Sequence, residues 1–155
     1  MPTSPREAIM DALVTALRTI GTTGSFSATV TPTVMRARHP ALTVPQYPFI
    51  YVGAEREDYG DGRHGNFGAA AKYLKTLGVG IAYWFIAGDM DQAVSAAVHD
   101  VEYALREWTI GGAATDLQIL SNEAFVSDTD EPLCGVRFEV QVAYGISDQS
   151  PSTRI

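Results

Sequence analysis

Three histidines and a single cysteine are the side chains of this sequence best suited to metal binding or acid–base and nucleophilic chemistry. His39 lies in a proline-rich loop, His64 in a glycine-rich segment, and His99 on the polar face of a helical pattern. Cys134 falls on the inward face of an alternating strand, where a thiol packs as a small hydrophobic group. Catalysis needs several titratable groups in one cleft, and these four are scattered along the chain. We expect no enzyme activity, and we expect His99 to be a solvated surface residue.

The strongest candidate for a metal or active site is His64 together with Asp58 and Asp61. Histidine and carboxylates are metal ligands, but this spacing lacks the alternating acids and distal glutamate of a calcium loop. We therefore expect no metal and no cofactor. One alternative stays open, a small α+β enzyme or ligand-binding domain built on this cluster. In that case replacing His64 by alanine would abolish activity or binding.

The charge balance argues against binding to a nucleic-acid backbone. Eleven basic and 18 acidic residues give a net charge of −7, and no basic cluster exceeds the short patch of Arg36, Arg38 and His39. Phosphate binding requires clustered Lys and Arg side chains, because affinity comes largely from released counterions. The glycines of 60–68 also lack the Lys-Ser/Thr ending of a phosphate loop. An acidic surface would instead let DNA slide past without sticking.

Length and composition predict one globular domain. The chain has 155 residues, of which 46% are hydrophobic and 19% charged. We expect a single domain at 1–146 and a flexible polar tail at 147–155. No signal peptide is evident at the start, and the apolar run 79–87 is too short to span a membrane as a helix. We expect a chain without an intrachain disulfide and without a membrane partner.

Two helices are predicted from their caps and apolar spacing. Ser4-Pro5-Arg6-Glu7 is a capping box with proline at the first helical position, and Gly21 follows as a stop, so we expect a helix at 4–20. Asp89 with Gln92 opens a second helix, which Gly111-Gly112 ends.

Alternation predicts five strands. The first covers 25–39 and is bent or at an edge because Pro32 removes a donor; the second is 49–55. A long irregular segment, 56–72, separates it from a strand at 73–87. Both faces of this strand are apolar or small, so we expect it to be central and covered on both sides. The last two, 117–126 and 133–144, form a hairpin. The element order α-β-β-β-α-β-β predicts an α+β fold, a mainly antiparallel sheet with two helices packed on it.

The chain resembles the tail terminator, or tail completion, proteins of long-tailed bacteriophages. The resemblance covers about residues 4–146 and rests on the element order and on short segments. They are Pro45-Gln46-Tyr47-Pro48-Phe49-Ile50-Tyr51-Val52 after the first helix, Asp89-Met90-Asp91 at the second helix, and Asp130-Glu131-Pro132-Leu133 before the last strand.

The resemblance implies a structural virion subunit, assembled in the host cytoplasm and located at the head-proximal end of the tail. Such proteins form a homohexameric ring that caps the tail tube, stops its polymerisation and docks to the head connector. The implied partners are further copies of the chain, the tail tube protein and the head-connector or neck protein. DNA would pass through the ring without sequence-specific binding. The alternative within this class is another neck or tail component: a head-closure subunit, a connector subunit or a tube protein.

A ring of identical copies needs a heterologous interface, in which one surface meets a different surface of the next copy. Position in the sequence suggests which side chains could contact copies or partners, from the glycine-rich segment and from the outward face of the last strand. These are Tyr59, Asp61, Arg63, His64, Phe67, Arg137, Glu139 and Gln141.

Overall fold

The computed structural model describes residues 4–36, 47–59, 72–106, 116–126, 133–147 and 150–154. They form two helices and six strands in chain order: α1 (Pro5–Leu17), β1 (Thr33–Arg36), β2 (Phe49–Tyr59), β3 (Lys72–Ile86), α2 (Met90–Arg106), β4 (Asp116–Val126), β5 (Leu133–Ser147) and β6 (Ser150–Arg154). The predicted order α-β-β-β-α-β-β is confirmed, and β6 follows it.

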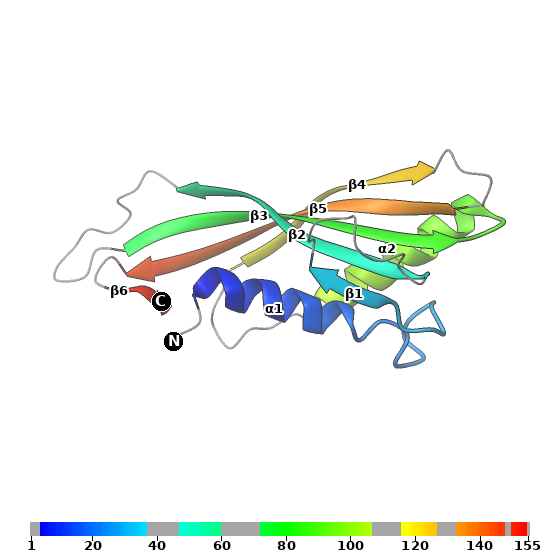
Figure 1. Cartoon of the computed structure of the whole chain (residues 1–155), viewed down its shortest axis with the longest axis horizontal. Coiled ribbons are helices and arrows are strands. Elements are labelled where there is room, and N and C mark those ends of the chain that lie inside the picture. Colours follow the sequence, from blue (N-terminus) through cyan, green and yellow to red (C-terminus); the bar gives the residue numbers. More distant parts are fainter. Residues whose placement is uncertain are drawn as a thin grey trace.

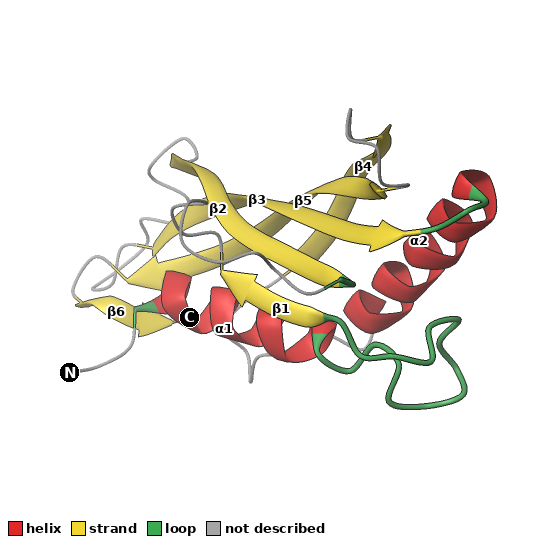
Figure 2. Ribbon diagram, turned by 45° about the vertical axis from the view of Figure 1, so that its right-hand side comes forward, coloured by secondary structure: helices red, strands yellow, loops and turns green. Residues whose placement is uncertain are grey.

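The strands form one sheet in the order β1-β2-β3-β5-β4, and β6 pairs with the end of β5. All neighbouring pairs are antiparallel except β1 with β2, which run parallel. Both helices lie on the same side of this sheet (Figures 1 and 2). The α+β class and the mainly antiparallel sheet with two helices on it are therefore confirmed.

The hydrophobic core lies between the helices and one face of the sheet. Ile9, Leu13 and Leu17, spaced at helical intervals on α1, are fully buried. They pack with alternate residues of the central strands, which point to the same face: Val79, Ile81, Val136, Phe138, Val140 and Val142. Each such side chain contributes about 1.5–3 kcal/mol on burial, so this layer fixes which face of each strand turns inward.

Helix α1 begins as predicted and ends earlier. The Glu7 N–H donates to the Ser4 hydroxyl over 3.2 Å, and Pro5 occupies the first turn. The reciprocal half of the capping box does not form, because the Glu7 carboxylate pairs with Arg36 of β1 instead. Residues 18–20 form a turn, and Gly21 follows with φ +82°, where a β-carbon would collide with the main chain of Val30. The helix thus ends at Leu17, four positions before the glycine that was predicted to stop it.

The predicted strand at 25–39 was too long. Within its described part only Thr33–Arg36 is a strand, at the edge of the sheet. The N–H groups of Ser27 and Ala28 donate to the carboxylate of Asp100, at 2.6 and 2.9 Å. Because these donors bind a side chain on α2, the segment cannot pair as a strand despite its alternating pattern.

The irregular segment was predicted too broadly at 56–72. Residues 56–59 continue β2, and Lys72 already belongs to β3. The register shifts between Ala54 and Arg56, so the alternation of apolar and polar residues is broken by a bulge. After the bulge the residues of β2 are mostly charged and no longer alternate with apolar ones. The sequence pattern therefore did not show that the strand continues.

The prediction that β3 is covered on both faces was wrong for the described residues. Val79 and Ile81 are fully buried under the helices, whereas Gly80, Ala82 and Trp84 on the opposite face are only partly buried. Ile86 is 49% exposed. Neither helix packs on this second face (Figures 1 and 2), which we call the helix-free face.

The second helix and the last two predicted strands follow the predictions closely. The Asp89 carboxylate accepts the N–H of Gln92 over 3.1 Å at the start of α2. Strands β4 and β5 pair antiparallel as the expected hairpin. Within the segment assigned to a flexible tail, Ser150–Arg154 form β6, which pairs with Ile146 and Ser147 of β5.

Candidate functional site

An aromatic row crosses four strands or their ends on the helix-free face. It consists of Phe49, Trp84 and Phe125, with ring centroids 6.0 Å apart between Phe49 and Trp84 and 4.4 Å apart between Trp84 and Phe125. Phe49 is 3% exposed, and its ring also contacts Tyr47 at 5.1 Å. The strand register puts Phe49 opposite Trp84, Trp84 opposite Gly135, and Gly135 opposite Phe125. A β-carbon at Gly135 would overlap the Phe125 ring at 2.5 Å, so glycine is what lets Phe125 reach Trp84.

Charged side chains lie next to the aromatic row on the same face. Arg137 of β5 donates to Glu55 of β2 across the narrow Gly80, and this hydrogen bond raises the pKa of Arg137. Glu139 and Glu123 lie nearby, at register positions next to Arg137. Among the described charged residues of this patch there are three carboxylates, those of Glu55, Glu123 and Glu139, and one guanidinium, that of Arg137. The face therefore combines partly buried aromatic side chains, Trp84 and Phe125, with an acidic strip, a composition suited to contacts between proteins.

The structure places three of the eight predicted contact residues on that face. Arg137 and Glu139 are exposed, and Gln141 is partly exposed, as the alternation of β5 indicated. Tyr59 is the last residue of β2, and its side chain lies outside the described part. Asp61, Arg63, His64 and Phe67 also lie outside the described residues.

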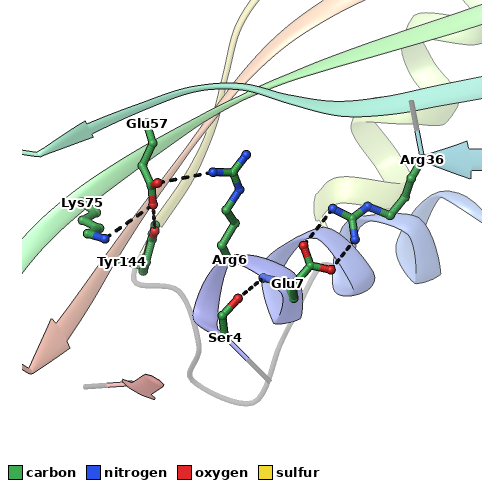
Figure 3. Close-up of polar contacts among 7 residues, drawn as sticks. All are labelled: Ser4, Arg6, Glu7, Arg36, Glu57, Lys75 and Tyr144. Atoms are coloured by element: carbon green, nitrogen blue, oxygen red, sulfur yellow. Dashed lines mark hydrogen bonds and ion pairs between the residues drawn. The ribbon is translucent and has the colours of Figure 1, made fainter. Parts of the chain in front are cut away.

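A second polar cluster ties α1 to the sheet (Figure 3). Glu57 of β2, whose side chain is 16% exposed, accepts from the hydroxyl of Tyr144 and pairs with Arg6 at 3.5 Å and with Lys75 at 3.8 Å. The first turn of α1 makes a separate contact, from Glu7 to Arg36, which lowers the pKa of Glu7. These contacts join α1 to β1, β2, β3 and β5, so the cluster has a structural role.

A cavity of about 400 Å³ opens between the segment 27–30, the start of β2, the end of β3 and the first half of α2. Its lining is mostly apolar and includes Val30, Phe85 and Ala96. The phenol of Tyr83 and the carboxylate of Asp100 also line it. Val30 and Ile86, which are 59% and 49% exposed, give the lining exposed apolar side chains. We call this space the Tyr83 cavity.

Tyr83 and Asp100, the two buried polar residues of the cavity lining, differ in how their side chains are hydrogen-bonded. Asp100 is 1% exposed and accepts the two main-chain N–H groups of Ser27 and Ala28. Tyr83 is 4% exposed, and its hydroxyl has no hydrogen-bond partner among the described residues. Burial, and secondarily the charge of Asp100, raises the pKa of Tyr83 to about 12.

Sequence reasoning missed Asp100, although the sequence carried a signal. The residue lies three positions after Ala97 and four before Ala104, both of which are buried on α2. A carboxylate on an apolar helical stripe is a buried acid that needs partners. Its partners lie more than 70 residues away in a loop, and no spacing rule reveals them.

The chemical candidates of the sequence do not come together in the described residues. Asp58 pairs with Arg56 on its own strand, and His99 is exposed with Nε2 3.3 Å from the Ser25 carbonyl oxygen. Cys134 is buried as expected, and burial raises the pKa of its thiol. Within the described ranges, no three His, Cys, Asp or Glu side chains are grouped as metal ligands would be. No described helix has the length and apolar character needed to cross a membrane.

No protein-family model matches this sequence, and no curated protein matches it either. Solved structures do share its fold. One is a chain in a structure described as the virion of a native gene transfer agent particle. It superposes with a TM-score of 0.53 at 17% sequence identity, covering 87% of this chain and 92% of that one. The likeness extends over nearly the whole of both chains, so the two share an overall fold.

Proposed function

We propose that this chain is a structural subunit of a phage-like virion, located at the head-proximal end of the tail. Six copies form a ring that caps the tail tube, stops its polymerisation and offers the docking surface for the head connector. The observation that carries the proposal is the fold shared, over 87% of this chain, with a chain of a gene transfer agent virion. The sequence resemblance to tail terminator proteins points the same way.

The surface chemistry supports an assembly role. The helix-free face offers partly exposed aromatic side chains beside ionic ones, and aromatic residues and Arg are enriched where proteins bind one another. Arg137, Glu139 and Gln141 on this face are the proposed contact residues that the structure describes. The excess of acidic side chains over basic ones suits a ring through which DNA passes without being held.

Imaging of assembled particles tests this location. A particle carrying the chain fused to a small electron-dense tag should show one tagged ring between the tube and the head. Particles made without the chain should have tubes of uncontrolled length that fail to join heads. Label along the whole tube would instead assign the chain as a tube protein, and label within the head opening would assign it as a connector subunit.

A further inference from the structure

The Tyr83 cavity and the exposed end of β4 are complementary features at different places on one chain. Val126, the last residue of β4, is 61% exposed, and β4 is the outermost strand on its side of the sheet. The cavity lies beside β2 and β3, and β5 separates β3 from β4. A side chain and a hole placed apart in this way cannot meet within one molecule.

We propose that the Tyr83 cavity receives the Val126 end of strand β4 from a second copy of this chain. This inference rests on the proposed ring and names one contact that would build it. A contact of this kind is heterologous, because each copy gives a protruding segment on one side and a hole on the other. Repetition of such a contact produces a closed ring when the rotation between copies closes.

The chemistry of the cavity favours an apolar polypeptide segment as its occupant. Exposed apolar side chains, Val30 and Ile86, belong to the lining, so an occupant that extends beyond the cavity would cover them. A volume of about 400 Å³ exceeds one valine side chain, which leaves room for the main chain that carries it. The Tyr83 hydroxyl, buried without a hydrogen-bond partner among the described residues, would donate to a carbonyl oxygen of that main chain.

Strand β4 has the right character to supply the segment. It is an edge strand whose residues are exposed or only partly buried along its whole length. An open strand edge presents unpaired main-chain N–H and C=O groups with which another chain can pair. Two large apolar side chains of β4 are exposed, Leu120 at 51% and Val126 at 61%. Only Val126 lies at the same end of the sheet as the cavity, since its register partner Cys134 is also opposite Phe85.

Two variants test the two halves of the contact separately. Val126→Asp places a charge on the inserted segment, and Ala96→Trp fills the cavity from α2. Each has a matched control on the same element: Leu120→Asp is about 20 Å away along β4, and Ser95→Trp is on the exposed side of α2. Mass measurement of the purified full chain by light scattering is expected to show that each test variant raises the assembly concentration at least tenfold. The controls should assemble as the unchanged chain does.

Mixing the two test variants distinguishes a heterologous contact from a symmetric one. In the mixture one contact stays intact, between the unchanged β4 end of Ala96→Trp and the open cavity of Val126→Asp, so assembly should stop at dimers. Circular dichroism spectra and unfolding midpoints close to those of the unchanged chain show that the variants fold. Rings of normal mass from both test variants would show that this contact does not form, and so would a loss of rings with Leu120→Asp alone. Either result would leave the proposal of a ring itself standing. If the unchanged chain is monomeric at every concentration, both the contact and the proposed ring fail.

Discussion

At the scale of single residues, Asp100 holds two segments together that are far apart in the sequence. Its carboxylate joins α2 to the segment before β1 through the N–H groups of Ser27 and Ala28. Because Asp100 is 1% exposed, water cannot take its place as the acceptor if the carboxylate is removed. This single side chain explains why an alternating sequence forms a loop there rather than a strand.

Replacing Asp100 by alanine should therefore lower the free energy of unfolding by about 2–4 kcal/mol, since two main-chain N–H groups lose a buried, charged acceptor. Asp100→Asn should cost less, because its amide oxygen still accepts one of the two bonds. Urea denaturation measures both, and Asp91→Ala on the exposed first turn of α2 is the control. An effect of Asp100→Ala no larger than that of the control would contradict this role.

Tyr83 gives the fold a specific response to alkaline pH. Its pKa is raised to about 12 in the folded protein, against 10.0 for an ordinary tyrosine. A raised pKa means that the stabilisation is fully present below pH 10 and is lost as the pH rises from 10 to 12. Between those values the unchanged chain should lose on the order of 2 kcal/mol more stability than Tyr83→Phe.

Near neutral pH, Tyr83→Phe should leave the stability of the single chain unchanged or raise it by up to about 1 kcal/mol, because a buried hydroxyl without a protein partner is removed. Unfolding curves of the two proteins at pH 7, 9, 10, 11 and 12, at concentrations too low for assembly, measure both effects. Parallel stability curves from pH 9 to 12 would show that Tyr83 is not buried in the way described.

At the scale of elements, Glu57 of β2 links α1 to strands β3 and β5. It contacts Arg6, Lys75 and Tyr144 and is largely shielded from water (Figure 3). Glu57→Gln should lower the free energy of unfolding by about 1.5–3 kcal/mol, the range for hydrogen bonds to charged groups. Amide hydrogen exchange should speed up in the first turns of α1 while β3 and β5 stay protected. Asp58→Asn, whose side chain is 53% exposed, should change neither quantity.

The aromatic row depends on a glycine. A β-carbon at Gly135 would overlap both the Tyr83 carbonyl oxygen and the Phe125 ring, and the main-chain oxygen cannot move aside. Gly135→Ala should cost about 1–3 kcal/mol, the usual penalty for overpacking, and should change the near-ultraviolet signal of Trp84. Gly24→Ala, where nothing lies within 4 Å, should be close to neutral. Equal costs for the two substitutions would argue against the tight packing at Gly135.

The helices and the central strands could be predicted from the sequence because their signals are local. Caps at Ser4 and Asp89 and the alternation of β5 all act within a few residues, and the structure confirms them. The errors arose where distant residues decide the outcome. Asp100 removed the donors of the first expected strand, and a bulge after Ala54 hid the second half of β2.

The candidate surfaces were harder to predict than the fold. The sequence indicated that Arg137 and Glu139 face outward, because β5 alternates without interruption. It gave no sign that Phe49, Trp84 and Phe125 form one row, since their meeting depends on the strand order β2-β3-β5-β4.

At the scale of the whole molecule, the two faces of the sheet have different roles. The inner face, which both helices cover (Figure 1), makes the core with α1 and α2. The helix-free face carries the aromatic row and the acidic strip. A chain that needs only to fold would have no use for aromatic side chains on an open face. In our account this face and the Tyr83 cavity serve assembly with copies and virion partners.

The most direct test of this account is the mass and shape of the purified full-length chain at assembly concentration. Six copies of a 16.7 kDa chain give a particle of about 100 kDa. Native mass spectrometry is expected to find that mass, and electron microscopy to show a ring with a central hole that attaches to the ends of tail tubes. A chain that remains at 16.7 kDa at every concentration and never attaches to tube ends would contradict the central claim.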